Sequence, residues 1–213
     1  MTDLATVRDR IAASAKLARR SPSEIHLIVV SKFRTVEQIE PLIAAGQCNF
    51  GESRVQEAAA KWPALRAAHP DLRLHMIGQL QSNKAAEAVA LFDTIHSLDR
   101  VSLLDALSDA ATKVGRFPTC FVQVNVGLEK QKGGIAPADL GDFLAAVRAS
   151  PLPLAGLMCI PPVELEPAPL FAFLSELARR HDVTGLSMGM SADYEIAVKL
   201  GATHVRVGSA LFA

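Results

Sequence analysis

The sequence is poor in cysteine, and its three cysteines are not arranged as a set. Cys48, Cys120 and Cys159 are widely spaced and odd in number, without a CxxC pair or the spacing of a zinc finger. Each lies in a strand-like apolar stretch, so we expect all three to be small buried hydrophobic residues. Thiols without a disulfide pattern are typical of reducing compartments, and a cytoplasmic location is therefore expected.

Other absences exclude further classes of protein. Lysine plus arginine equals aspartate plus glutamate, at 22 each, so no basic excess favours a nucleic acid or a membrane surface as partner. Residues 1–20 lack the apolar core of a secretory signal, and no apolar run reaches membrane-spanning length. P-loop, dinucleotide-binding and HExxH motifs are missing. What remains is a chain that is 50% hydrophobic, enough for one sizeable core.

Apolar runs alternate with helical patterns along the chain. The run 25–32 is apolar until it ends in Ser31 and Lys32, which is typical of a parallel strand buried on both faces. Seven further strand-like segments follow, at 48–52, 73–78, 94–98, 119–125, 154–160, 185–189 and 203–208. Helical periodicity fills the intervals, and a further helical pattern precedes the first strand.

Helix boundaries support this order of elements. Thr35 and Gln38 form a capping box, and Gly46, Gly115 and Gly201 stand where three helices should end. Eight strands with intervening helices and one extra helix in front predict a single (β/α)8 TIM barrel domain over residues 1–213. A doubly wound open sheet is the alternative.

Polar residues collect at the predicted carboxyl ends of the strands, where barrels of this kind carry their chemistry. Lys32 follows an apolar strand, a setting that can desolvate the amine and lower its pKa, as a Schiff-base lysine needs. A solvated surface charge is the alternative. Lys84 and Lys132 lie in polar, loop-like stretches and compete less well.

Two glycine- and serine-containing loops follow the seventh and eighth strands. The stretches SMGMSADYE (187–195) and RVGSALF (206–212) lie where such barrels often bind phosphate, although each alone fits a turn and a helix cap. Arg206 lies inside the last strand and needs an acceptor, either a salt-bridge partner or the ring nitrogen of a bound pyridine. His75 and His96 fit ordinary packed or hydrogen-bonded roles, and Glu52 and Glu57 fit capping or surface roles.

Long stretches of the chain resemble one known family. They are VVSKFRTVEQI, AAGQCNFGESRVQEAAAKW, LHMIGQLQSNK, VQVNVGLEKQKGG, GLMCIPP and GLSMGMSADYEIAVKLGATHVRVGSALF. These resemble the pyridoxal 5′-phosphate (PLP) homeostasis proteins, also called proline synthetase co-transcribed homologues. The resemblance implies a barrel similar to the N-terminal domain of alanine racemase. It also implies a PLP-binding protein of the vitamin B6 pool, with delivery of PLP to apo-enzymes as a further expected role.

The resemblance also assigns roles to residues. Lys32 matches the lysine that forms the internal aldimine, and Arg206 is similar to the arginine that faces the pyridine nitrogen. The remaining candidate cofactor contacts are Ser53, His75, Ser187, Gly189, Met190, Ser191, Gly208 and Ser209. The family usually has Gly-Glu-Asn-Tyr where this chain has GESR, and a histidine where it has Gln79. The first departure puts a ring contact from Ser53 in doubt, and Arg54 adds a charge nearby.

Carrier and catalyst make different demands on this scaffold. A racemase needs a base on each face of PLP, and in alanine racemase the second base is a tyrosine from another domain. The one tyrosine, Tyr194, lies on the helix after strand seven, and the sequence ends soon after the last strand. We therefore expect a PLP carrier without an enzyme's turnover, with a PLP-dependent amino-acid racemase as the alternative. A Schiff-base aldolase is a third possibility, without an acidic partner beside the lysine.

Overall fold

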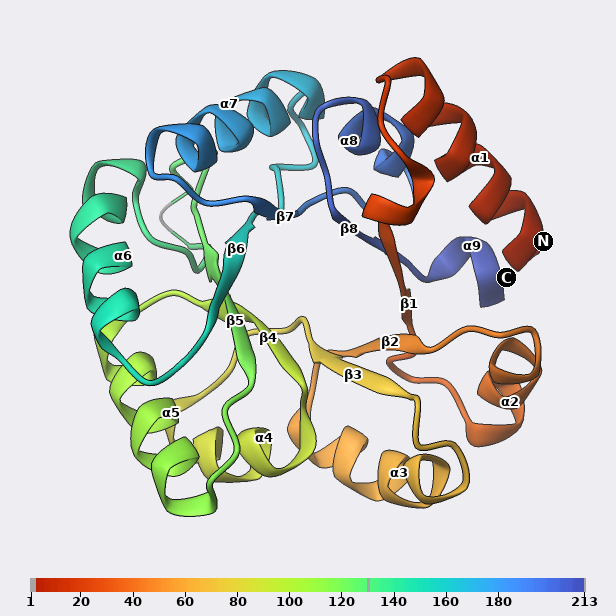
Figure 1. The fold of residues 1–213 in the computed structure, drawn as a ribbon, viewed down its shortest axis with the longest axis horizontal. Coiled ribbons are helices and arrows are strands. Elements are labelled where there is room, and N and C mark those ends of the chain that lie inside the picture. The colour runs from red at the N-terminus through yellow and green to blue at the C-terminus, as the bar shows by residue number, and fades with distance from the viewer. Residues whose placement is uncertain (1–2, 130, 213) are drawn as a thin grey trace.

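Eight parallel strands close into a barrel in the computed structural model, which describes residues 3–129 and 131–212 (Figure 1). Each strand pairs with the next, and the last pairs with the first. The strands are β1 (His26–Val30), β2 (Asn49–Glu52), β3 (Arg73–Met76), β4 (Thr94–Leu98), β5 (Thr119–Gln123), β6 (Leu154–Met158), β7 (Gly185–Ser187) and β8 (His204–Val207). The predicted (β/α)8 barrel is confirmed, and the open sheet is wrong.

Helices surround the barrel and follow its strands in order. They are α1 (Leu4–Leu17), α2 (Val36–Ala44), α3 (Val55–Ala68), α4 (Ala85–Leu91), α5 (Val101–Val114), α6 (Leu140–Ala149), α7 (Pro167–Arg180), α8 (Tyr194–Lys199) and α9 (Ser209–Phe212). The helix α1 is the predicted extra helix, and α9 is a single turn after β8. Within the described ranges, no helix has both the length and the apolar character that crossing a membrane requires.

The local signals in the sequence act where they were expected. Thr35 caps α2 with the predicted capping box. Gly115 ends α5 with φ +71°, a left-handed conformation that glycine adopts at little cost. Both features satisfy backbone groups that a helix end leaves unpaired.

Two separate cores follow from the alternation of side chains along each strand. Leu27 and Val29 of β1 point outward into the large cluster between barrel and helices. Ile28, Phe121 and Met158 are fully or almost fully buried, but they lie outside that cluster. We place them inside the barrel, where they share the space with buried polar side chains, which are His75, His96, Ser187 and Arg206.

The N-terminal segment is hydrogen-bonded to the chain on both sides of β1, next to β2 and next to β8. Arg8 of α1 donates to the carbonyl oxygens of Ala45 and Gly46 at the end of α2. Arg20, just after α1, donates to the carbonyl oxygens of Val198 and Ala202, 2.9 and 2.8 Å away. Figure 1 shows α1 lying beside α8.

One prediction about cysteine is wrong. Cys48 is exposed, because it precedes β2 in the turn after α2 rather than lying inside the strand. Cys120 and Cys159 are buried as expected, and burial raises the pKa of each thiol to about 12. These two thiols are therefore protonated at neutral pH and unreactive as nucleophiles.

Candidate functional site

Lys32 lies on an exposed turn at the carboxyl end of β1. The strand ends at Val30, two residues earlier than predicted, and Phe33 takes a left-handed conformation with φ +60° that turns the chain. The Nζ of Lys32 lies 6.0 Å from the centre of the Phe33 ring. The expectation that the strand desolvates this amine is wrong, because the side chain is exposed to solvent.

A buried ion pair braces this turn from α3. Lys61 donates to the carbonyl oxygens of Ser31 and Arg34, at 2.9 and 3.0 Å, and its Nζ lies 2.7 Å from Oε1 of Glu52. Glu57 accepts the backbone N–H of Phe33. The backbone on both sides of Lys32 is therefore held to α3 by hydrogen bonds, while its side chain is exposed.

Sequence reasoning missed this brace. It assigned Glu52 a capping or surface role, which is wrong, because the side chain is fully buried. Its Oε1 accepts from the Ser31 hydroxyl and the Trp62 indole as well as from Lys61. The one signal in the sequence was that Glu52 ends a strand and Lys61 follows in the next helix. Lysines are common on solvated helices, so this pattern did not indicate a buried pair.

Lys61→Met is expected to lower the free energy of unfolding by about 3 kcal/mol, because it leaves the Glu52 carboxylate buried and unpaired. Urea unfolding measures this change. Lys84→Met is the matched control: its pair with Glu87 is exposed, so a change within about 0.5 kcal/mol is expected. Adding Glu52→Gln to Lys61→Met should recover part of the loss, and equal effects of Lys61→Met and Lys84→Met contradict the brace.

The loops after β7 and β8 are joined directly. The N–H of Gly208 donates to Oγ of Ser191 at 3.2 Å. Gly189 has φ +91°, and a Cβ there would lie 2.5 Å from the Cβ of Ala197, so only glycine fits. A Cβ on Gly208 would lie 3.0 Å from the Cβ of Val30. The structure thus brings Gly208 and Ser191 together, level with Val30 and close below the Lys32 turn.

Arg206 is a buried cation at the same end of the barrel. Its side chain donates to Oγ of Ser187 at 2.6 Å and to the carbonyl oxygen of Cys159 at 2.9 Å. Burial lowers the pKa of the guanidinium from its ordinary value. A salt bridge is not the explanation for Arg206, since neither it nor Lys32 forms an ion pair among residues 3–129 and 131–212. A buried cation without a carboxylate is costly, and an anionic ligand offsets that cost.

The other predicted contacts lie at different depths. Ser187 and His75 are buried inside the barrel, where they hydrogen-bond to His96. Met190 and Ser209 are exposed on the two loops. Ser53 is half-buried at the rim and lines a small pocket of about 220 Å³ together with Gln79. The direct contact of each of these residues with a cofactor stays a prediction.

Tyr194, the tyrosine that a racemase would need, lies on α8 and is buried in the outer core at 4% exposure. It is therefore not available as a proton acceptor in the barrel mouth.

Arg54 lies beside the Lys32 turn and extends over the ring of Phe33, 5.4 Å from its centre. This arginine adds its charge beside the Lys32 turn, as its position in the sequence suggested.

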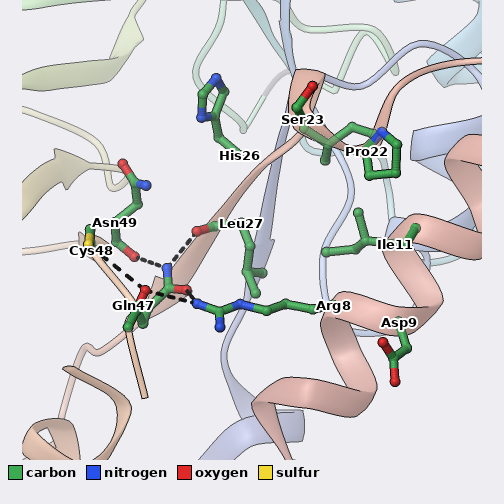
Figure 2. Close-up of a pocket in the computed structure, with 13 residues that line it drawn as sticks. Arg8, Asp9, Ile11, Pro22, Ser23, His26, Leu27, Gln47, Cys48 and Asn49 are labelled. Atoms are coloured by element: carbon green, nitrogen blue, oxygen red, sulfur yellow. Dashed lines mark hydrogen bonds between the residues drawn. The ribbon is translucent and has the colours of Figure 1, made fainter. Parts of the chain in front are cut away.

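The most spacious pocket described lies at the opposite end of the barrel, with a volume of about 570 Å³ (Figure 2). Arg8 and Gln47 meet on its floor, and Gln47 donates to the carbonyl oxygens of Leu27 and Asn49. These polar groups are used in holding β1, β2 and α1 together. In barrels of this type the amino ends of the strands serve stability, so we place the candidate site at the Lys32 end.

The chain resembles known proteins over its whole length. Residues 2–213 match the family described as alanine racemase, N-terminal domain. The chain is 38% identical to the pyridoxal phosphate homeostasis protein of Escherichia coli (strain K12), over 99% of this chain and 94% of that protein. It is 40% identical to the protein of that name from Pseudomonas aeruginosa, over 99% of this chain and 93% of the relative.

Solved structures resemble it as well. The structure of PipY from Synechococcus elongatus with PLP bound has 42% identity and a TM-score of 0.82, covering 95% of this chain and 100% of that chain. The structure of PipY without PLP has a TM-score of 0.85. Alanine racemase from Clostridium difficile has a TM-score of 0.73 at 15% identity and is covered over 56% of its length, a likeness of fold alone.

Proposed function

The chain belongs to the pyridoxal phosphate homeostasis protein family, and we propose that it holds PLP covalently on Lys32 and helps to balance the vitamin B6 pool. The observation that carries this proposal is the buried Arg206, which has no acidic partner among residues 3–129 and 131–212 and lies at the same end of the barrel as Lys32, whose amine is unpaired in the same ranges. An anionic pyridine compound with an aldehyde suits both groups. The solved structure of PipY with PLP bound supports the same ligand.

The residues present fit PLP in separate ways. The exposed amine of Lys32 is free to condense with an aldehyde, which PLP supplies, with the release of one water. Ser191 and Gly208 lie together on the two loops: the Gly208 N–H donates to Oγ of Ser191, which leaves the hydrogen of the Ser191 hydroxyl to donate to a phosphate. Arg206 donates hydrogen bonds and does not give up its proton, so beside a ring nitrogen it favours the unprotonated pyridine. That state suits a carrier better than a catalyst.

The wider role is part of the same proposal. We infer that the protein acts in the cytoplasm and passes PLP to apo-enzymes that depend on it. The solvent exposure of Lys32 supports release, because water and an incoming amine reach that side chain.

Reduction with borohydride tests the proposal. The purified protein is incubated with PLP, reduced, digested and weighed by mass spectrometry. We expect one PLP adduct, on the peptide that contains Lys32, together with a visible absorption band before reduction. A protein that takes up no PLP contradicts the proposal. Formation of D-amino acids from L-amino acids at ordinary enzyme rates, measured by chiral chromatography, contradicts the carrier role and favours a racemase.

A further inference from the structure

A line of hydrogen bonds runs through the inside of the barrel below Arg206. Oγ of Ser187 lies 2.9 Å from Nδ1 of His96, and Nε2 of His96 lies 3.0 Å from Nδ1 of His75. Nε2 of His75 then lies 3.1 Å from Oδ1 of Asn49 at the start of β2. Together with the bond from Arg206 to Ser187, this line connects β8, β7, β4, β3 and β2.

Four members of this line are shielded from water, and the fifth, Asn49, is half-buried beside the pocket of Figure 2. Ser187 and His96 are fully buried, and His75 and Arg206 are each 4% exposed. The ring of His96 stacks on Phe121, with centres 4.5 Å apart and planes inclined by 12°. This stacking fixes the plane of the imidazole, so both of its nitrogens keep their direction.

The buried histidines are neutral. Desolvation lowers the pKa of His75 to about 4 and holds the pKa of His96 well below its ordinary value. A neutral imidazole has one donor nitrogen and one acceptor nitrogen. The polarity of the whole line therefore depends on its last member.

Asn49 ends the line with an acceptor. Because Oδ1 of Asn49 only accepts, Nε2 of His75 carries the hydrogen and Nδ1 of His75 accepts. Nε2 of His96 must then donate, and Nδ1 of His96 accepts the hydroxyl hydrogen of Ser187. Oγ of Ser187 is left with lone pairs only, which receive the Arg206 guanidinium.

We propose that Ser187, His96, His75 and Asn49 are positioning residues, a one-way line of hydrogen bonds that fixes the Arg206 guanidinium toward the ring nitrogen of bound PLP. This inference rests on the proposed function. It gives Ser187 a different task from the phosphate contact expected of it, because its hydrogen is already donated to His96. It also gives His75 a task without cofactor contact, because His96 and Ser187 lie between it and Arg206.

The polarity is tested first in the protein without PLP. Nitrogen-15 spectra of the imidazole side chains distinguish a protonated ring nitrogen from a bare one. We expect the Nε2–H tautomer for both His75 and His96 at neutral pH. The Nδ1–H tautomer at either position overturns the proposal, and this result does not depend on PLP uptake.

The positioning role is tested with two substitutions of one residue. His96→Leu removes both nitrogens, and His96→Asn keeps an acceptor near the place of Nδ1. In His96→Leu we expect faster rotation of the Arg206 guanidinium by NMR, about tenfold weaker PLP binding, and a changed nitrogen-15 signal of the PLP ring nitrogen. His96→Asn should restore most of the affinity. His69→Leu, at an exposed histidine after α3, is the control and should change none of these values.

A folded His96→Leu protein with unchanged Arg206 rotation and unchanged PLP affinity overturns the proposal. If that variant does not fold, Asn49→Leu replaces it, since this substitution removes only the terminal acceptor. In Asn49→Leu we expect His75 to populate both tautomers and the Arg206 guanidinium to rotate faster, which supports the proposal. Unchanged nitrogen-15 spectra of this variant overturn it. A wild-type protein that shows the expected tautomers but takes up no PLP contradicts the proposed function instead.

Discussion

Lys32→Ala is expected to abolish the PLP adduct that borohydride traps, and with it the visible absorption band. The reason is that the amines of the other lysines at this end of the barrel are paired with carboxylates. Nζ of Lys61 is held in the brace by Glu52 and two carbonyl oxygens. Nζ of Lys84 lies 2.8 Å from Glu87, and Nζ of Lys132 lies 2.7 Å from Glu129. Of these four lysines, Lys32 alone has no such partner among the residues described, so we expect its amine to be the one of the four that reacts.

Companion variants separate covalent attachment from charge. Lys32→Arg keeps the positive charge but cannot form the link, so we expect it to lose the adduct as completely as Lys32→Ala while binding PLP more tightly than that variant. Lys84→Ala and Lys132→Ala should keep the full adduct. The mass of the reduced protein measures each case. Retention of the adduct in Lys32→Ala, on whichever lysine, contradicts the assignment.

The protein is expected to unfold in mild acid because of its buried histidines. Burial lowers the pKa of His75 from 6.5 to about 4 and that of His204 from 6.5 to about 3, and His96 is shifted in the same direction. Below pH 6.5 the unfolded chain binds these protons and the folded barrel does not. The stability conferred by the neutral histidines is therefore complete above pH 6.5 and is lost as the pH falls toward 4 and then 3.

The size of this effect follows from the number of protons. Three histidines that are protonated in the unfolded state alone give a slope of about 4 kcal/mol per pH unit near pH 5. Typical domains have about 5–15 kcal/mol in total, so we expect unfolding to be largely complete at about pH 4. Urea unfolding at a series of pH values between 7 and 4 measures the slope.

A substitution tests whether His204 contributes to the slope of the free energy of unfolding against pH. His204→Leu should reduce it by about 1.4 kcal/mol per pH unit, since one proton fewer is taken up. His69→Leu, at the surface, should leave it unchanged. A free energy of unfolding that stays flat between pH 6.5 and 5 contradicts the interpretation.

The architecture was predictable because its signals are local. The capping box at Thr35 and the left-handed glycine at Gly115 act within one helix turn, so the sequence around them contains all that they need. The two loops after β7 and β8 were predictable for a related reason, since a barrel places those loops together in a known position. The bond from Gly208 to Ser191 agrees with that expectation.

What was missed depends on contacts between distant segments. The burial of Glu52 depends on Lys61, and the depth of Lys32 depends on where β1 ends. The histidine line depends on the register between strands, which pairs His75 with Thr94 and Ser187 with His204. Periodicity within one strand does not fix this register. It indicates only that His75 and His96 sit in strands, which is as far as the sequence could lead.

The hydrogen bonds from Arg20 to the segment before β8 have a consequence for biosynthesis. Arg20 and Ala202, which meet through a hydrogen bond, are 182 positions apart in the chain. During translation the segment that contains Arg20 emerges long before its acceptors exist, and the apolar face of α1, with Leu4, Val7 and Ile11, has no final place to pack. We therefore expect the barrel to close only after its last strand has left the ribosome, because β1 has no β8 to pair with before then.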